Sequence, residues 1–311
     1  MWNNIIDAHL NKLKPEVKYI RVYNKDAKGL YISLYVREDM KELVTGIESK
    51  KIKTSNADKI GSILISFKIG DTVFYMMNCQ LSNGKGDYEK RFDEMRVIYY
   101  SCARKSLEDV TQLKEAKFLF GDLNFSIELD QSLASTMLKE EQYEEMKRFD
   151  QLWNQYHNFH YLPALIESEI TFKPTYKYPK DSSELDLKTV PGWRNRILWS
   201  KENSISCQKY DSSNSITFSE HKPIYGIYQV KINIKKETDS DESLGFEEVE
   251  AKFPAINEEE TKLFFKSKLT TDLSRNKDML PSKNSDKFNH ITSSINIERK
   301  NSYDLIRHSG K

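Results

Sequence analysis

Four short segments of the sequence combine charged or amide side chains with residues that favour turns. They are residues 121–124 (GDLN), 172–178 (FKPTYKY), 191–199 (PGWRNRILW) and 219–223 (SEHKP). Asp122, Asn124 and Glu220 carry the carboxylate and amide oxygens that hard cations such as Mg²⁺ prefer, and they could also orient a water molecule. These three residues are therefore candidates for a divalent-metal site.

The same segments supply groups that recognise phosphate. Lys177, Arg196 and His221 provide the cationic and hydrogen-bonding groups that a phosphoryl oxygen requires. Together with the oxygen-bearing residues, they indicate metal-assisted hydrolysis of a phosphate ester. Each segment also has an ordinary structural interpretation, such as a strand-to-turn corner for GDLN or an exposed loop for FKPTYKY. The functional interpretation depends on all four segments meeting in space.

The first segment follows a short apolar run, and this predicts a buried strand over residues 117–123. In layered α/β folds, chemistry is placed at the ends of such central strands. Residues 39–58 are expected to form a loop or hairpin. Periodicity predicts further helices over 2–13, 87–105 and 130–156, and strands over 19–23, 30–36, 60–69, 73–81, 169–173, 195–199 and 224–232.

The composition predicts a folded part and a tail. The 311 residues are 38% hydrophobic and 12% aromatic, which is enough for a substantial core. From about residue 233 the chain becomes rich in charged residues, Ser and Asn, and such a segment cannot bury enough apolar area to offset its ordering entropy. We expect a catalytic-type domain over 1–232 and a mostly disordered tail over 233–311.

Charge and cysteine content restrict the partners and the compartment. The net charge of +1 gives no global field that would draw the chain to nucleic acid, so recognition of an anion must be local. Three cysteines without metal-type spacing suggest reduced thiols inside the cell. Since no apolar stretch approaches the roughly 20 residues of a membrane span, we expect a cytoplasmic protein that could act at the cytosolic face of membranes. The sequence does not predict an oligomeric state.

The four segments, in this order, resemble the motifs of the inositol polyphosphate 5-phosphatases of the endonuclease/exonuclease/phosphatase superfamily. The family shows Gly-Asp-Leu-Asn, Phe-x-Pro-Thr-Tyr-Lys, Pro-Ala-Trp-Cys-Asp-Arg-Ile-Leu-Trp and Ser-Asp-His-Lys-Pro. Earlier in the chain, NCQLSNGKGDYEKRFDEM and ADKIGSILISF look like two further family segments. The resemblance covers about residues 1–232, and the Pro-Thr-Tyr-Lys motif separates it from the related nucleases.

The resemblance implies a fold and a cofactor. The family fold is a four-layer α/β/β/α sandwich of the DNase I type, with Mg²⁺ and substrate at one edge of the paired sheets. The chain starts at the helix that follows the family's Trp-Asn and Gln-Glu motifs. We therefore expect the first strand or strands, and the principal Mg²⁺ glutamate, to be lacking and Mg²⁺ binding to be weakened. Glu220 is then the remaining metal-ligand candidate.

The resemblance also implies catalytic roles. Asp122 would activate the attacking water, and Asn124 would help to stabilise the transition state. His221 would face the scissile 5-phosphate, and Asn195 occupies the position of the aspartate that pairs with this histidine. Substrate-phosphate contacts are implied for a further set of residues: Gln80, Tyr176, Lys177, Arg196, Lys222 and Lys59.

Several motif positions depart from the family pattern. Gln80 replaces a phosphate-facing histidine, Asn195 an aspartate, and Ser126 an arginine, while Glu220 is one methylene longer than the family's aspartate. Arg194 replaces a cysteine, a change to which the sequence alone attaches little weight. These departures predict impaired hydrolysis of a phosphoinositide or inositol polyphosphate 5-phosphate. The alternative is a pseudophosphatase that acts as a phosphoinositide-binding or scaffolding domain.

Overall fold

The computed structural model describes residues 2–13, 16–27, 29–54, 60–84, 86–102, 114–158, 165–202, 204–235 and 246–248. Its helices are α1 (Trp2–Leu13), α2 (Tyr88–Tyr100), α3 (Gln131–Lys139), α4 (Tyr143–Lys147) and α5 (Gln151–Asn158), with a 3-10 helix η1 (Glu38–Leu43). Its strands are β1 (Tyr19–Ala27), β2 (Leu30–Arg37), β3 (Val44–Lys53), β4 (Ile60–Ile69), β5 (Thr72–Gln80), β6 (Lys114–Asp122), β7 (Leu165–Glu167), β8 (Asn195–Ser200), β9 (Ile205–Ser212), β10 (Ile224–Val230), β11 (Asn233–Lys235) and β12 (Phe246–Glu248).

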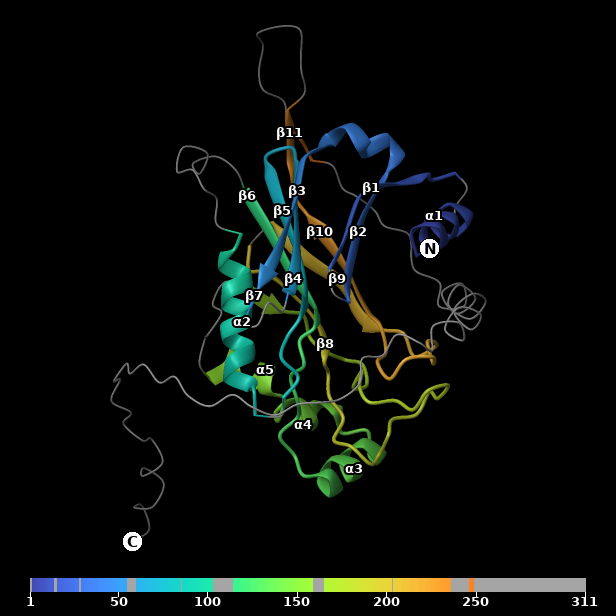
Figure 1. Ribbon diagram of the computed structural model, residues 1–311, viewed down its shortest axis with the longest axis vertical. Helices are drawn as coiled ribbons and strands as arrows, with labels where there is room; N and C mark the ends of the chain where they lie inside the picture. Colours follow the sequence, from blue (N-terminus) through green and yellow to red (C-terminus); the bar gives the residue numbers. More distant parts are fainter. Residues whose placement is uncertain are drawn as a thin grey trace, which may run out of the picture. The chain divides into compact units, whose positions relative to one another are not determined.

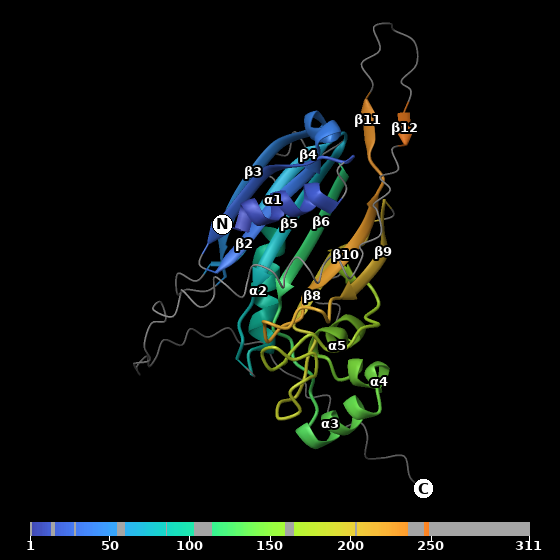
Figure 2. The same ribbon diagram turned by 90° about the vertical axis from the view of Figure 1, so that its right-hand side faces the viewer.

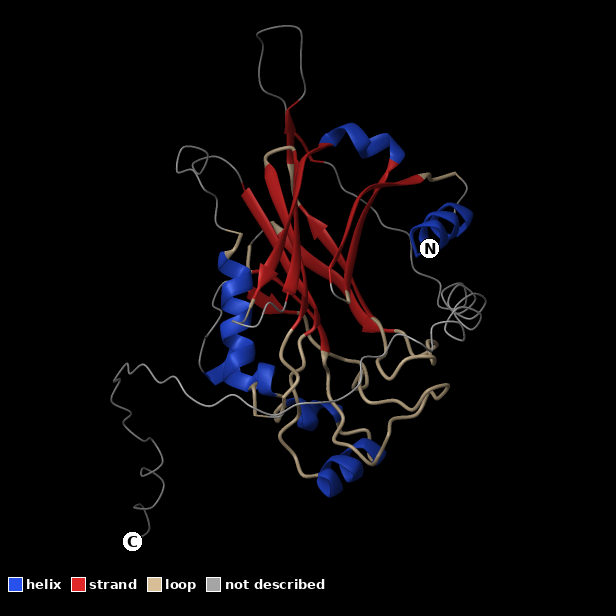
Figure 3. Cartoon of the chain, viewed as in Figure 1, coloured by secondary structure: helices blue, strands red, loops and turns tan. Residues whose placement is uncertain are grey.

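A six-stranded mixed sheet forms the centre of the fold, in the order β3-β4-β5-β6-β8-β7 (Figures 1 and 3). The parallel pair β5–β6 lies in the middle, and antiparallel strands flank it on both sides. β1–β2 and β9–β10 are hairpins in a second layer. The ends of β5 and β6 are thus placed side by side, with β8 next to them.

Alternating side chains on β4 show how the layers pack. Leu64 points to the core cluster that contains Phe92, Met95 and Ile98 of α2. Ile63 and Ile65 point to the opposite face, where they pack against the β1–β2 hairpin. Because successive side chains of β4 are buried on opposite faces, its sequence is a nearly continuous apolar run.

The β9–β10 hairpin covers the other half of the same sheet face. Phe118 of β6 and Trp199 of β8 form a cluster with Ile205, and Tyr228 packs against both aromatic rings. Helix α1 lies beside the β1–β2 hairpin, where Asn11 exchanges hydrogen bonds with the Tyr19 backbone (Figure 2). Helix, central sheet, paired hairpins and outer helix make the four-layer arrangement expected for this chain.

Several predicted elements need correction. The helix expected over 130–156 is three helices, interrupted where Glu141 adopts a positive φ of 55°. Residues 39–58 contain η1 and the edge strand β3, whose exposed lysines suit a sheet edge. The prediction of a strand over residues 169–173 is wrong, because the strand in this region is Leu165–Glu167, which pairs with β8. The sequence also missed β9.

The boundary expected at residue 232 stays a prediction. Asn233 lies just beyond it and is firmly attached, because its side chain and backbone exchange hydrogen bonds with Asp71 in the β4–β5 turn. β11 then pairs with β12. Apart from these two strands, the predicted tail lies outside the described residues.

Candidate active site

Three polar side chains lie in one row across the neighbouring strands β5, β6 and β8. Gln80 is the register partner of Asp122, and Asp122 is also the register partner of Asn195. Residues in register on adjacent strands project to the same face of a sheet. The strand ends therefore carry an amide, a carboxylate and a second amide next to one another.

The corner after β6 requires the residue types found there. Gly121 has a φ of 130°, and a Cβ atom at this position would lie 2.1 Å from the Cys79 carbonyl oxygen. Asn124 has a φ of 55°, a conformation that asparagine tolerates better than most residues. Its buried amide donates to the Leu81 carbonyl at 3.1 Å. GDLN is thus the strand-to-turn corner, and two of its residues also line a polar cavity.

A polar cavity of about 260 Å³ opens at this corner. It is lined by Gln80, Leu81, Asn83, Asp122, Asn124, Tyr176, Arg194, Glu220 and His221. These residues come from all four sequence segments and from the end of β5, so the fold brings most of the predicted site together. A larger cavity of about 580 Å³ lies between other loops and contains none of the predicted site residues.

Asp122 has a carboxylate oxygen prepared for a partner. Its Oδ1 atom is buried and makes no hydrogen bond within the described part of the chain. Burial raises the pKa of Asp122, and the positive charges of His221 and Arg194 oppose this effect. A buried acceptor without a partner is costly, so this oxygen is well suited to receive a proton or a hydrogen bond from a bound molecule.

His221 is oriented by Asn195. The Nδ2 atom of Asn195 donates to the Lys222 carbonyl at 2.9 Å, so its Oδ1 atom faces Nδ1 of His221 at 3.2 Å. In this arrangement Nδ1 of His221 carries the hydrogen and Nε2 carries the free electron pair. Burial lowers the pKa of His221, while the carboxylate of Asp122 opposes the shift. Because the partner of His221 is the neutral amide of Asn195, it adds no negative charge that would stabilise the protonated imidazolium.

Tyr176 forms one wall of the cavity. Its backbone exchanges two hydrogen bonds with Gly192, at 3.1 and 2.8 Å, and its ring centroid lies 4.6 Å from that of His221. Next to it, Lys177 forms an ion pair with Glu220 at 3.3 Å. The hydrogen bond to Glu220 also raises the pKa of Lys177. Lys177 and Glu220 therefore occupy the rim as a pair.

Arg194 is a pocket residue that the sequence reasoning missed. Its guanidinium lies over the Tyr176 ring, 3.8 Å from the centroid, and its Nη1 atom donates to Asn124 Oδ1 at 3.3 Å. The signal was present in the sequence, because a cation stands where the resembling family has a cysteine. Asn83 was missed as well, although it lies three residues after Gln80 in a segment that resembles the family.

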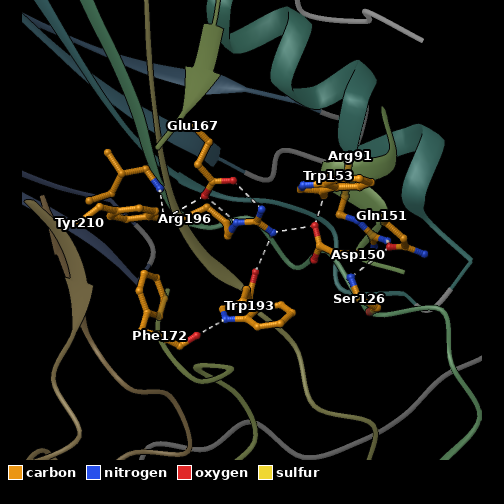
Figure 4. A network of polar contacts seen from close by, with 11 residues as sticks. Arg91, Ser126, Asp150, Gln151, Trp153, Glu167, Phe172, Trp193, Arg196 and Tyr210 are labelled. Atoms are coloured by element: carbon orange, nitrogen blue, oxygen red, sulfur yellow. Dashed lines mark hydrogen bonds and ion pairs between the residues drawn. The ribbon is translucent and has the colours of Figure 1, made fainter. Parts of the chain in front are cut away.

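The phosphate-binding role expected for Arg196 is wrong. Arg196 is fully buried, and its guanidinium donates to Glu167 at 2.7 and 2.5 Å and to Asp150 at 2.9 Å (Figure 4). Burial opposes its charge, but Asp150 and Glu167 outweigh this and raise the pKa of Arg196. Arg196 follows Asn195 on β8 and so points to the opposite face, away from the pocket.

The phosphate contact expected for Lys222 is also wrong. It is fully buried, and its Nζ atom donates to the carbonyls of Ser182 and Ile216 at 2.9 and 2.7 Å. Its ammonium also lies 4.4 Å from the Tyr178 ring centroid. Lys222 thus holds loops together behind the site. Lys59 lies outside the described residues.

The metal site expected from the sequence is incomplete in the described part of the chain. No three His, Cys, Asp or Glu side chains there are grouped closely enough to hold an ion. Asp122 offers one free oxygen, whereas Glu220 is paired with Lys177. These residues alone do not fit a divalent cation, which needs six or more oxygen ligands in the protein and its water shell.

Comparison with known proteins places this geometry in a family. Residues 1–227 match the family described as Endonuclease/Exonuclease/phosphatase family 2. The type II inositol 1,4,5-trisphosphate 5-phosphatase of Mus musculus is 28% identical over 240 residues, which cover 72% of this chain and 24% of that protein. The type I inositol polyphosphate 5-phosphatase 2 of Arabidopsis thaliana is 26% identical over 242 residues, covering 72% and 37%. The chain thus spans well under half the length of these relatives.

Solved structures confirm the fold. The inositol polyphosphate 5-phosphatase domain of SPsynaptojanin, in complex with inositol (1,4)-bisphosphate and calcium ion, matches with a TM-score of 0.65 at 24% identity, covering 74% of this chain and 69% of that one. A Cimex nitrophorin in a ferrous NO complex matches with a TM-score of 0.59 at 21% identity, covering 73% and 80%. Since one fold carries such different ligands, the fold alone does not define the reaction. The match over residues 1–227 does establish that this chain belongs to Endonuclease/Exonuclease/phosphatase family 2.

Proposed function

We propose that the chain hydrolyses the 5-phosphate of a phosphoinositide or inositol polyphosphate in the pocket at the ends of β5, β6 and β8. The observation that carries this proposal is the convergence of Asp122, Tyr176 and the Asn195–His221 pair on one polar cavity. The inositol 5-phosphatases named among the relatives support the substrate class. A cavity of this size accommodates a phosphorylated headgroup rather than a large polymer.

The side chains of the pocket can divide the work of hydrolysis. Asp122 presents its unpartnered Oδ1 to accept a proton from the attacking water. As the water oxygen forms the new bond to phosphorus, the bond from phosphorus to the inositol oxygen breaks, and this oxygen takes a proton from solvent to leave as the hydroxyl. His221 presents Nε2, since Nδ1 is engaged by Asn195. The amide of Asn124 is held at the corner after β6 by its hydrogen bond to the Leu81 carbonyl. Arg194, which donates to Asn124, adds positive charge near the negative charge that develops on the phosphate in the transition state.

A non-hydrolytic role is the second candidate, and two observations favour it. The described residues do not complete a divalent-metal site. Asn195 supplies no charge to stabilise a protonated His221, and an aspartate-to-asparagine change next to a catalytic histidine costs about 10⁴-fold in a serine-protease triad. In this case the chain is a pseudophosphatase that holds the headgroup as a binding or scaffolding domain.

Phosphate release by the purified 311-residue chain separates the two candidates. The substrates are soluble inositol 1,4,5-trisphosphate and vesicles containing phosphatidylinositol 4,5-bisphosphate, each with Mg²⁺ and with a chelator. If the chain is a hydrolase, Asp122→Asn should reduce release by about 10²-fold or more, because the proton acceptor is lost. Binding without release supports the pseudophosphatase. Release that Asp122→Asn leaves unchanged contradicts the assignment of the site.

Cofactor and location belong to the same proposal. The described residues do not complete a divalent-metal site, so the assays with Mg²⁺ and with a chelator test whether hydrolysis depends on the Mg²⁺ expected from the sequence. Action on the lipid would place the chain in the cytoplasm, in peripheral contact with the cytosolic face of a membrane. No helix among the described residues is long and apolar enough to cross a membrane. Binding to the vesicles, measured by co-sedimentation, tests this contact.

A further inference from the structure

Two basic side chains line the candidate pocket among the described residues, and they are His221 and Arg194. The Nδ1 atom of His221 is already engaged by Asn195. An arginine stays protonated throughout the physiological range. Recognition of a phosphate dianion in this cavity therefore depends first on Arg194.

Arg194 is held in position before any ligand arrives. Its carbonyl accepts a hydrogen bond from the Leu123 backbone at 2.8 Å, which ties it to the corner after β6. Its guanidinium stacks on the Tyr176 ring at 3.8 Å. Tyr176 is itself fixed by the two hydrogen bonds to Gly192. A guanidinium on such a platform loses little freedom when it binds an anion.

The hydrogen-bonding capacity of Arg194 is largely unused. A guanidinium has five N–H donors, and the side-chain hydrogen bond found here is a long one of 3.3 Å, to the neutral oxygen of Asn124. Within the described part of the chain, no carboxylate lies within ion-pair distance of Arg194, although the charge of the Asp122 carboxylate in the same pocket interacts with it. It is half-buried, so water satisfies its donors less completely than at an open surface. A planar fork with free donors matches two oxygens of a phosphate group.

We propose that Arg194 is a direct ligand of a substrate phosphate, presented on the Tyr176 ring. The phosphate is one carried by an inositol headgroup, and in this respect the inference rests on the proposed function. Lys177 is the nearby lysine, but it is already paired with Glu220 at the rim. Arg194 thus supplies the fixed positive charge of the pocket and determines how tightly the headgroup binds.

Calorimetric titration of the full chain with inositol 1,4,5-trisphosphate tests the role of Arg194. Arg194→Gln should weaken binding about 10- to 100-fold, because charge-assisted hydrogen bonds are lost. Arg194→Lys should recover only part of the affinity, since an ammonium keeps the charge but lacks the fork. Arg148→Gln, at an exposed arginine outside the pocket, is the matched control and should bind like the wild type. Parallel titrations with inorganic phosphate and with lipid vesicles show whether a free or a lipid-borne phosphate is preferred.

The outcomes separate this inference from the proposed function. If the wild-type chain binds none of the three probes, the proposed function fails. If the wild type binds and Arg194→Gln binds equally well, the inference is overturned while the proposed function stands. Should Arg194→Gln fail to fold, the wild type still gives an answer through modification by phenylglyoxal. Bound inositol 1,4,5-trisphosphate should protect Arg194 at least about tenfold, as measured by peptide mass spectrometry, and a lack of protection overturns the inference.

Discussion

Two arginines of one segment, Arg194 and Arg196, occupy opposite kinds of environment. Arg196 is fully buried and donates to Asp150, Glu167 and the Trp193 carbonyl (Figure 4). Arg194 lies on an aromatic ring beside a cavity and has one long hydrogen bond. The network around Arg196 is closed, whereas the pocket around Arg194 is open.

Neighbouring residues extend the network around Arg196, although the Oδ2 atom of Asp150 has no hydrogen-bond partner in the described part of the chain. Tyr210 donates its hydroxyl to Glu167 at 2.9 Å, and the Trp153 backbone donates to Asp150. With four of its five N–H donors engaged, Arg196 can support the fold but has little capacity left to bind a ligand. A charge with free donors at a cavity costs stability unless an anion completes it. Unused hydrogen-bonding capacity, rather than residue type, therefore distinguishes the functional arginine from the structural one.

Removing the centre of the closed network should give the largest effect. Arg196→Met leaves the carboxylates of Asp150 and Glu167 buried near each other without a cation. Loss of one partner from a buried ion pair costs about 3–5 kcal/mol, so we expect the free energy of unfolding to fall by this amount. Urea denaturation followed by circular dichroism measures the change.

A second substitution makes this test specific. Glu167→Gln in the Arg196→Met background should restore part of the lost stability, because one fewer buried carboxylate is left unpaired. Arg148→Met, at an exposed position, should change stability by less than about 0.5 kcal/mol. An Arg196→Met protein that unfolds at the same urea concentration as the wild type would contradict the closed network.

Lys222 should give a smaller effect of the same kind. Its ammonium donates to two neutral carbonyls, so Lys222→Met leaves no unpaired charge behind. We expect a loss of about 1–3 kcal/mol from the two unsatisfied acceptors. Headgroup affinity of the folded variant should stay within about twofold of the wild type, because Lys222 does not line the pocket. A tenfold loss of affinity at unchanged stability would restore the phosphate-binding role expected from the sequence.

The sequence predicted correctly those parts of the site whose geometry follows from strand pairing. Asp122 and Asn195 meet because they are register partners on β6 and β8, and His221 joins them through its hydrogen bond to Asn195. The partners of Arg196 could not be read in the same way. Asp150 and Glu167 lie 46 and 29 residues away in the chain, and neither belongs to a recognised segment.

Side-chain direction was the second limit. Strand alternation applied over the whole segment would place Arg194 and Arg196 on the same face. However, β8 begins only at Asn195, so Arg194 lies in the preceding loop and turns into the pocket. The fold shows the same contrast. The doubly buried β4 was predicted from its apolar run, whereas the mostly polar β9 was missed.

The smallest expected effect comes from giving His221 a charged partner, as Arg196 has in its network. Asn195→Asp puts a carboxylate about where an amide oxygen now lies, 3.2 Å from Nδ1 of His221. Burial lowers the pKa of His221 in the wild type, so its neutral form is favoured and its contribution to stability is lost as the pH falls below the unfolded value of about 6.5. The new carboxylate should raise the pKa of His221, because an opposite charge next to the ring favours the imidazolium.

This shift should reverse the effect of pH on the contribution of His221. Once its folded pKa lies above the unfolded value, the pair stabilises the fold fully below about pH 6.5, and this gain is lost as the pH rises through the folded pKa. Asp122, Arg194, Glu220 and Tyr176 also face the imidazole, and the nearby charge of Asp122 adds to the destabilisation at high pH. The pKa of His221 from an NMR titration, with Asn83→Asp at the exposed pocket rim as the control, measures the effect. If the pKa of His221 in Asn195→Asp equals the wild-type value, burial rather than the missing carboxylate determines the protonation of His221.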